Sequence, residues 1–131
     1  MIRRLGGFYM TDPMKKILLA EDEDSVRSFL SRALQRAGYE VVSCPDGDTA
    51  ILALDQGPYD LLLTDIVMPG GMHGNELADL ARSIKPDLKV LFTSGYAEPS
   101  VAGKEFAATE SWLKKPYTAA DLAARLRKLL D

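Results

Sequence analysis

Several features that often direct the interpretation of a sequence are scarce in this chain of 131 residues. It contains one cysteine, Cys44, so an internal disulfide is excluded and we expect a reducing, cytoplasmic environment. No apolar run approaches the roughly 18 residues that a membrane-spanning helix requires, so we expect no membrane insertion. Residues 1–16 also lack the apolar core of a signal peptide.

Concentrated positive charge is missing as well. The formal net charge is −3 and the basic residues are scattered instead of forming a stripe, so we expect no nucleic-acid partner. The phosphate-binding motif G-x-x-x-x-G-K-[ST] does not occur, which excludes a P-loop nucleotide hydrolase. The single histidine, His73, lies in a glycine-rich loop, and we expect no chemical role for it.

The remaining composition is that of an ordinary globular domain, with 47% hydrophobic and 27% charged residues. The length fits one domain with an adequate core. We expect residues 1–15 to form a disordered or loosely attached N-terminal arm, and residues 16–131 to form one folded domain.

Five short apolar runs alternate with five segments of helical periodicity, and no repeat or low-complexity segment separates them. The expected strands are residues 17–20, 41–42, 61–64, 89–93 and 112–113. The expected helices are residues 26–37, 50–54, 77–84, 99–108 and 122–130. This alternation predicts an α/β fold, a (βα)5 three-layer sandwich in which helices cover both faces of a parallel five-stranded sheet.

The stretch from Tyr59 to Gly71 is the central segment of the predicted fold. Its apolar run, residues 61–64, is typical of a strand buried on both faces, and it leads directly into Asp65. Taken alone, Asp65 is either a cap for the following turn or a reactive group at the edge of the sheet. Ligands of such folds bind outside the carboxyl ends of the strands, so the residues at those ends decide between the two.

Charged and hydroxyl side chains follow four of the five expected strands. In the flavodoxin-like strand order 2-1-3-4-5, the first and third strands are neighbours about 4.8 Å apart. Glu21 and Asp22 would then lie beside Asp65, while Ser94 and Lys115 end the fourth and fifth strands.

This set of side chains predicts a cation site. Two carboxylates about 4 Å apart repel each other by roughly 4 kcal/mol at an effective dielectric constant near 20. Lys115 offsets one negative charge, and a divalent cation would neutralise the remainder. Oxygen ligands without histidine or cysteine favour Mg²⁺ (or Mn²⁺) over zinc. Such a cation, with the Ser94 hydroxyl and the Lys115 ammonium, could hold a phosphoryl group for which Asp65 is the nucleophile.

Four motifs in order along the chain resemble those of two-component response-regulator receiver domains. They are residues 17–24 (ILLAEDED), 60–69 (DLLLTDIVMP), 92–97 (FTSGYA) and 113–117 (LKKPY). The resemblance covers residues 16–131 and implies a signalling phosphoacceptor and not an enzyme, one that catalyses at most its own phosphotransfer and autodephosphorylation. It implies that Asp65 is phosphorylated by a histidine kinase or a histidine phosphotransfer protein.

The resemblance also implies roles for the residues around Asp65. The implied metal ligands are Glu21 through water, Asp22, Asp65 and the backbone carbonyl of Val67. The implied phosphate-contacting and switch residues are Ser94, Lys115 and Trp112, and Pro116 would follow a cis peptide bond. An unknown downstream protein would bind the face formed by the family's fourth helix, fifth strand and fifth helix. The stretch at residues 92–99 also resembles receivers fused to hybrid histidine kinases, so a freestanding receiver and a kinase receiver both stay open.

Four positions depart from the commonest family pattern. Glu21 stands where the family usually has aspartate, and Ser94 where threonine is more frequent. The loop at residues 68–74 is one residue longer than usual, and Gly70 and Gly71 should loosen it. Trp112 stands where the family has a smaller switch aromatic, so it is either a core residue or the switch.

Other classes fit the residues less well. A haloacid-dehalogenase-type phosphatase needs a second aspartate two residues after the nucleophile, where Val67 stands. A flavin-binding flavodoxin needs a hydroxyl-rich loop after the first strand, where the four acidic residues 21–24 would repel phosphate. The alternative that remains is a pseudo-receiver, a protein-interaction module that is not phosphorylated.

Overall fold

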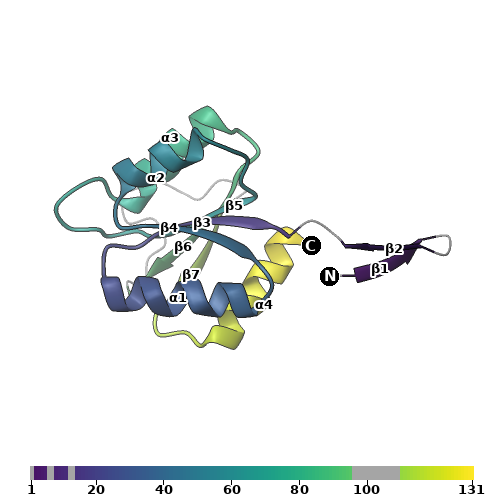
Figure 1. Ribbon diagram of the computed structural model, residues 1–131. Helices are drawn as coiled ribbons and strands as arrows, with labels where there is room; N and C mark the ends of the chain where they lie inside the picture. The colour runs from purple at the N-terminus through teal and green to yellow at the C-terminus, as the bar shows by residue number, and fades with distance from the viewer. Residues whose placement is uncertain (1, 6–7, 12–13, 96–109) are drawn as a thin grey trace.

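The computed structural model describes residues 2–5, 8–11, 14–95 and 110–131. Within them, five strands form one sheet and four helices cover it (Figure 1). The strands of this sheet are β3 (Lys16–Ala20), β4 (Glu40–Cys44), β5 (Leu61–Asp65), β6 (Lys89–Ser94) and β7 (Glu110–Lys114). The helices are α1 (Asp24–Arg36), α2 (Gly47–Leu54), α3 (Gly74–Ile84) and α4 (Ala119–Leu130). The helix predicted at residues 99–108 lies outside the described residues.

The sheet has the predicted topology. Its strand order is β4-β3-β5-β6-β7 and every neighbouring pair is parallel, which is the order 2-1-3-4-5 when these strands are counted along the chain. The flavodoxin-like prediction is therefore confirmed. Because β5 is central, Asp65 emerges in the middle of the carboxyl edge, with β3 on one side and β6 on the other.

Two hydrophobic clusters lie on opposite faces of the sheet. Leu62 contributes to the cluster that includes residues of α2 and α3, whereas Leu61 and Leu63 contribute to the cluster that includes residues of α1 and α4. Figure 1 shows the same division, with α2 and α3 above the sheet and α1 and α4 below it. All three leucines have no exposed surface, as expected for a parallel strand covered on both faces.

Side chains fix the start of two helices. At α2, a carboxylate oxygen of Asp46 accepts a hydrogen bond from the Thr49 N–H at 2.7 Å. At α4, the Thr118 hydroxyl accepts from the Asp121 N–H and the Asp121 carboxylate accepts from the Thr118 N–H, which is the capping box that this spacing predicts. These hydrogen bonds satisfy N–H groups that have no partner inside the helix.

The first residues of the chain contain a second, separate sheet. Strands β1 (Ile2–Leu5) and β2 (Phe8–Thr11) pair antiparallel with each other and belong to no other sheet among the described residues. Sequence periodicity did not predict these strands. That residues 1–15 form a loosely attached arm, separate from a domain at 16–131, stays a prediction.

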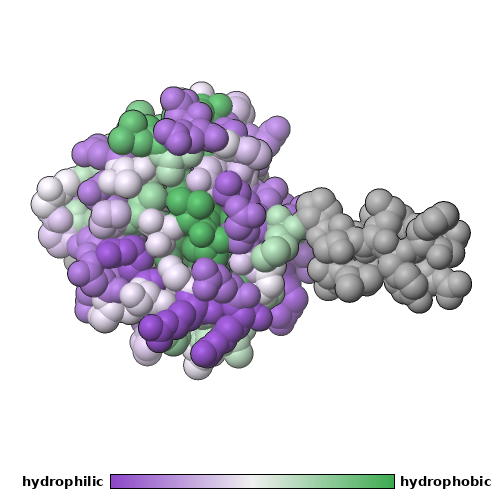
Figure 2. Space-filling model, in the orientation of Figure 1, coloured by the Kyte–Doolittle hydropathy of each residue, from purple (hydrophilic) through white to green (hydrophobic). Residues whose placement is uncertain are grey.

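The surface of the domain is mixed in polarity. Figure 2 shows hydrophilic side chains over most of one face, with small hydrophobic patches that include the region over α2 and α3. Leu52, Leu80 and Ile84 are among the exposed large apolar residues on these two helices. Among the described residues, no helix combines the length and apolar character needed to cross a bilayer.

Candidate functional site

Asp65 ends the central strand at the carboxyl edge of the sheet. Its side chain is 14% exposed, and one of its carboxylate oxygens, Oδ2, lies 2.9 Å from the Nζ of Lys115. The main chain around it is also fixed, because the Thr64 hydroxyl donates to the Asp65 carbonyl oxygen at 2.9 Å. Asp65 is therefore a partly accessible carboxylate on a rigid support.

Two further carboxylates reach the same place from β3. Oxygen atoms of Glu21, Asp22 and Asp65 all lie within 4.8 Å of one another. Glu21 is buried, with 2% of its surface exposed, whereas Asp22 is exposed. The parallel register of β3 and β5 explains why these carboxylates lie together. Ala20 pairs with Thr64, so the residues that follow the two strands leave the sheet side by side. The predicted grouping of these three residues is present in the structure.

Burial makes the charged form of Glu21 unfavourable. Burial, together with the neighbouring carboxyls of Asp22 and Asp65, raises the pKa of this carboxyl from 4.5 to about 7. A hydrogen bond from the Glu23 N–H to Oε2 of Glu21, at 2.9 Å, and the charge of Lys115 act in the opposite direction. The site thus holds more negative charge than Lys115 balances.

This donor set fits a small, hard cation. Carboxylate oxygens that lie within 4.8 Å of one another, in a site partly shielded from water, are the ligands that Mg²⁺ prefers. The excess negative charge on Glu21, Asp22 and Asp65 gives an electrostatic reason for such an ion. Val67 follows Asp65 by two residues, so its carbonyl belongs to the loop that leaves the end of β5.

Ser94 and Lys115 occupy the neighbouring strand ends. Ser94 is the last residue of β6 and is 1% exposed. Its carbonyl oxygen accepts a hydrogen bond from the Lys115 N–H at 2.7 Å, which ties the chain after β7 to the end of β6. The Lys115–Pro116 peptide bond is cis. The structure therefore places Ser94 and Lys115 at the same edge as Asp65.

Trp112 lies within β7, before the carboxyl end of that strand. It pairs with Phe92 in the β6–β7 register and packs against the cluster that includes residues of α2 and α3. Its indole Nε1 is buried and has no hydrogen-bond partner, the one such side-chain atom found among the described residues. An unsatisfied buried N–H costs roughly 1–3 kcal/mol. Trp112 thus combines core packing with an unpaired polar atom.

Three residues near the site were not singled out from the sequence. Tyr117 is close enough for the charges of Glu21 and Asp65 to affect it, and burial together with those charges raises its pKa to about 12. Arg27 donates from Nη1 to the Glu21 carbonyl oxygen at 2.9 Å.

Gly74 is the third missed residue. It lies so close to the end of β5 that a Cβ atom there would stand 2.0 Å from the Asp65 carbonyl oxygen. The Gly-rich sequence of the loop signals a tight turn but does not say which glycine meets the strand.

The fold and the site define a class: a flavodoxin-like α/β domain with an acidic cluster, a buried serine and a lysine at the carboxyl edge of its sheet. The sequence model of the response regulator receiver domain matches residues 17–127. The chain therefore belongs to the response regulator receiver family. It is the receiver domain of a two-component signalling protein and not a conventional enzyme.

Individual relatives agree with this assignment. The chain is 44% identical over 118 residues to the response regulator receiver protein CpdR of Brucella abortus (strain 2308). The aligned region covers 89% of this chain and 98% of that protein. It is 38% identical over 118 residues to the sensor kinase CckA of the same strain, covering 88% of this chain but 12% of the kinase. The solved structure of the response regulator TrrA from Thermotoga maritima, in complex with Mg²⁺-BeF, has a TM-score of 0.75 and 31% identity, covering 89% of this chain and 100% of that one.

Proposed function

We propose that Asp65 accepts a phosphoryl group and that this reaction requires Mg²⁺. The observation that carries the proposal is the convergence of Glu21, Asp22 and Asp65 within 4.8 Å beside Lys115. The TrrA complex with Mg²⁺-BeF supports it, because that ligand occurs in a related protein of the same fold. A pseudo-receiver would have no need to keep the acidic cluster and the lysine together.

The proposed cation would be held by Asp22, Asp65 and the Val67 carbonyl, and Glu21 would act through water. Bound there, it would draw negative charge away from the phosphoryl oxygens. Lys115 already contacts Asp65 and would contact a phosphoryl oxygen from the same position, and the Ser94 hydroxyl would contact another. The residues of the chain therefore orient the phosphoryl group and balance its charge.

The chemical step is a phosphoryl transfer between two proteins. An oxygen of Asp65 forms a bond to phosphorus while the bond from phosphorus to a histidine nitrogen of the donor breaks. The donor is a histidine kinase or a histidine phosphotransfer protein, as the similarity to a receiver within the sensor kinase CckA suggests. Hydrolysis of the aspartyl-phosphate would release inorganic phosphate and restore Asp65.

The proposed output surface includes β7 and α4. These elements are joined by Arg125, whose Nη1 donates to the Trp112 carbonyl oxygen at 2.6 Å and to the Ser111 hydroxyl at 3.0 Å. Trp112 stands on β7 just before Lys115, and we assign it the switch position by which a change at Asp65 reaches this face. The third component of the predicted face, the helix at residues 99–108, lies outside the described residues.

A phosphorylation assay tests the proposal. Incubation with acetyl phosphate should add one phosphoryl group only when Mg²⁺ is present, and the adduct should be stable in acid and labile in base, as an acyl phosphate is. Asp65→Asn should abolish the addition, because its amide lacks the nucleophilic oxygen. Intact-mass spectrometry measures both results. Persistent labelling of Asp65→Asn, or no labelling of the native chain with Mg²⁺, would contradict the proposal.

A further inference from the structure

The loop after Asp65 is closed by two hydrogen bonds that reach back from the start of α3. The Gly74 N–H donates to the Ile66 carbonyl oxygen at 2.8 Å. The Met68 N–H donates to Nδ1 of His73 at 3.1 Å. Val67 lies between the two anchored positions, so its main chain is held from both sides.

The second of these bonds acts on the Val67 carbonyl directly. This carbonyl and the Met68 N–H belong to the same peptide unit, which is planar and trans, so the two groups point in opposite directions. A hydrogen bond that directs the N–H toward the imidazole therefore fixes the direction of the carbonyl as well. Burial of the Met68 side chain, which is 2% exposed, anchors the residue but does not set the rotation of that peptide plane.

The side chain of Met72 packs against the hydrophobic cluster that includes residues of α2 and α3, but the turn before it is less restrained. Gly70 has a φ of +86°, and the exposed Gly70 and Gly71 give the chain conformational freedom that other residues lack. His73 itself is well placed to provide restraint because it is the N-cap residue of α3. Its own N–H donates to Oε1 of Glu76 at 3.3 Å, which ties it to the first turn of the helix.

We propose that His73 is a positioning residue that orients the Val67 carbonyl as a metal ligand, acting through the Met68 N–H. The inference rests on the proposed function, since it presumes a cation at the acidic cluster. It requires Nδ1 to be unprotonated, with the ring proton on Nε2, because only then can Nδ1 accept a hydrogen bond.

Mg²⁺ affinity tests this proposal by titration calorimetry. His73→Ala removes the acceptor and should weaken Mg²⁺ binding about tenfold, the lower end of the usual effect of losing a group that orients a metal ligand. In His73→Asn the amide oxygen can replace Nδ1 as acceptor, so affinity should stay within about twofold of the native value. The His73 side chain also accepts from the Glu76 N–H in a capping box. Glu76→Ala is the matched control, because it removes the bond from the His73 N–H to the Glu76 carboxylate and leaves the Met68–His73 bond in place.

Amide hydrogen exchange, followed by NMR in the metal-free protein, gives a readout that does not depend on the cation. The Met68 amide should exchange faster in His73→Ala than in the native chain, and His73→Asn should restore its protection. Glu76→Ala should leave this amide protected.

The outcomes separate this inference from the proposed function. Native Mg²⁺ affinity in His73→Ala, or an equal loss of affinity in Glu76→Ala, overturns the role of His73. If the native chain shows no saturable Mg²⁺ binding, or Asp22→Asn binds as tightly as the native chain, the proposed metal site itself is wrong. Failure of the metal site is detected with the native chain and Asp22→Asn alone, before any His73 variant is compared.

Discussion

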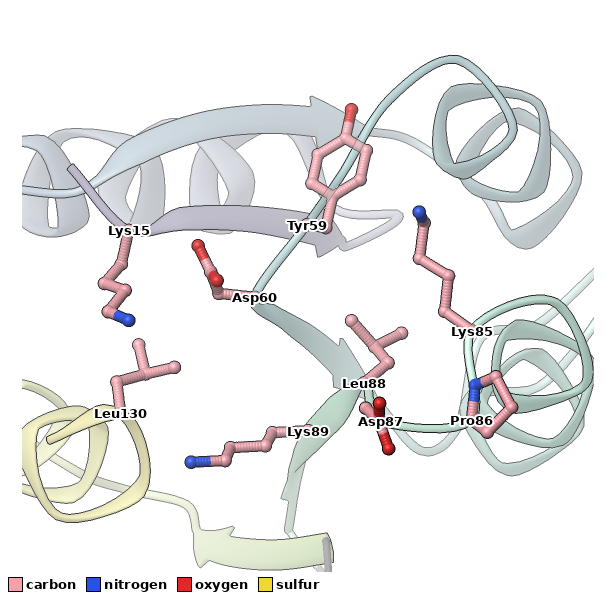
Figure 3. A pocket seen from close by; sticks show the side chains of 9 residues that line it. All are labelled: Lys15, Tyr59, Asp60, Lys85, Pro86, Asp87, Leu88, Lys89 and Leu130. Atoms are coloured by element: carbon pink, nitrogen blue, oxygen red, sulfur yellow. The ribbon is translucent and has the colours of Figure 1, made fainter. Parts of the chain in front are cut away.

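The two ends of the parallel sheet differ in the signs of the charged side chains that they bring together. At the carboxyl end, the side chains of Glu21, Asp22 and Asp65 converge, and among the described residues Lys115 alone forms a salt bridge with one of their carboxylates. At the amino end, a hollow of about 430 Å³ is lined by three lysines and two aspartates, together with four other residues (Figure 3). Both ends are therefore rich in charge, but only one collects charge of a single sign.

Several charged groups at the amino end have partners within the chain. Oδ2 of Asp60 accepts a hydrogen bond from the Lys16 N–H at 2.8 Å, and the Nζ of Lys16 lies 3.4 Å from a Glu40 oxygen. The Nζ of Lys89 donates to the Leu129 carbonyl oxygen near the end of α4. Figure 3 shows that the amines do not converge, since Lys85 extends toward Tyr59 while Lys15 points toward Leu130.

This difference separates charged groups that stabilise the fold from charged groups that need a ligand. Where opposite charges and main-chain groups face each other, as around Lys16, the interactions hold strands and loops together and leave no demand for a ligand. Where carboxylates face one another, as around Asp65, the repulsion persists in the folded chain and is relieved only by a cation or a proton. Each of the following predictions changes one end and uses the other, or a matched variant, as its reference.

The largest effect is expected from the glycine next to the acidic site. Gly74→Ala would place a Cβ atom 2.0 Å from the Asp65 carbonyl oxygen, a main-chain atom that cannot move without disturbing β5. We expect a loss of about 3 kcal/mol or more in the free energy of unfolding, measured with urea. Gly57→Ala near the amino end is the control, because the nearest atom to its Cβ is the Lys16 Nζ at 3.9 Å. Equal stabilities of the two variants would contradict the expected contrast.

The closeness of Gly74 to Asp65 also marks the limit of what the sequence could predict. The parallel sheet and the strand-end positions of Glu21, Asp22, Asp65 and Lys115 follow from apolar periodicity and the alternation of strands and helices. The strand order came from the flavodoxin-like class of fold, because the alternation alone allows other orders. The approach of Gly74 and the bond from Met68 to His73 depend on the path of a loop whose glycines permit many conformations.

Strand lengths were underestimated for a related reason. Residues 41–42 were expected as a strand, whereas β4 runs from Glu40 to Cys44. Its polar residues pair through main-chain groups, which apolar patterns do not report. The single histidine shows the same limit: its glycine-rich loop does not indicate that the imidazole accepts a hydrogen bond from the main chain of that loop. That His73 has no chemical role stays a prediction.

The second prediction uses the excess charge at the carboxyl end. The pKa of Glu21 is raised from 4.5 to about 7 in the folded chain, first by burial, so the folded state binds this proton more tightly than the unfolded state. The stability that Glu21 contributes is therefore full below about pH 4.5 and is lost as the pH rises through 7. We expect the metal-free protein to lose on the order of 2 kcal/mol across this range, measured by chemical unfolding at several pH values.

Glu21→Gln isolates this effect. The glutamine is uncharged at every pH but keeps an oxygen that can accept from the Glu23 N–H. The variant should show a flatter dependence on pH than the native chain, and it should be the more stable of the two above pH 7 when no metal is present. A native-like slope in Glu21→Gln would mean that other groups account for the pH dependence.

The smallest effect is expected at the amino end. Asp60→Ala leaves the Lys16 N–H without its carboxylate acceptor and should lower the free energy of unfolding by about 1 kcal/mol. Asp60→Asn retains an acceptor oxygen and should cost less than half of that. Because charge at this end is balanced locally, neither change should alter the Mg²⁺ dissociation constant by more than about twofold, whereas Asp22→Asn at the other end should raise it at least tenfold. If Asp60→Asn weakened Mg²⁺ binding as much as Asp22→Asn, the two ends of the sheet would be electrostatically coupled, and the separation between structural and ligand-binding charge would be wrong.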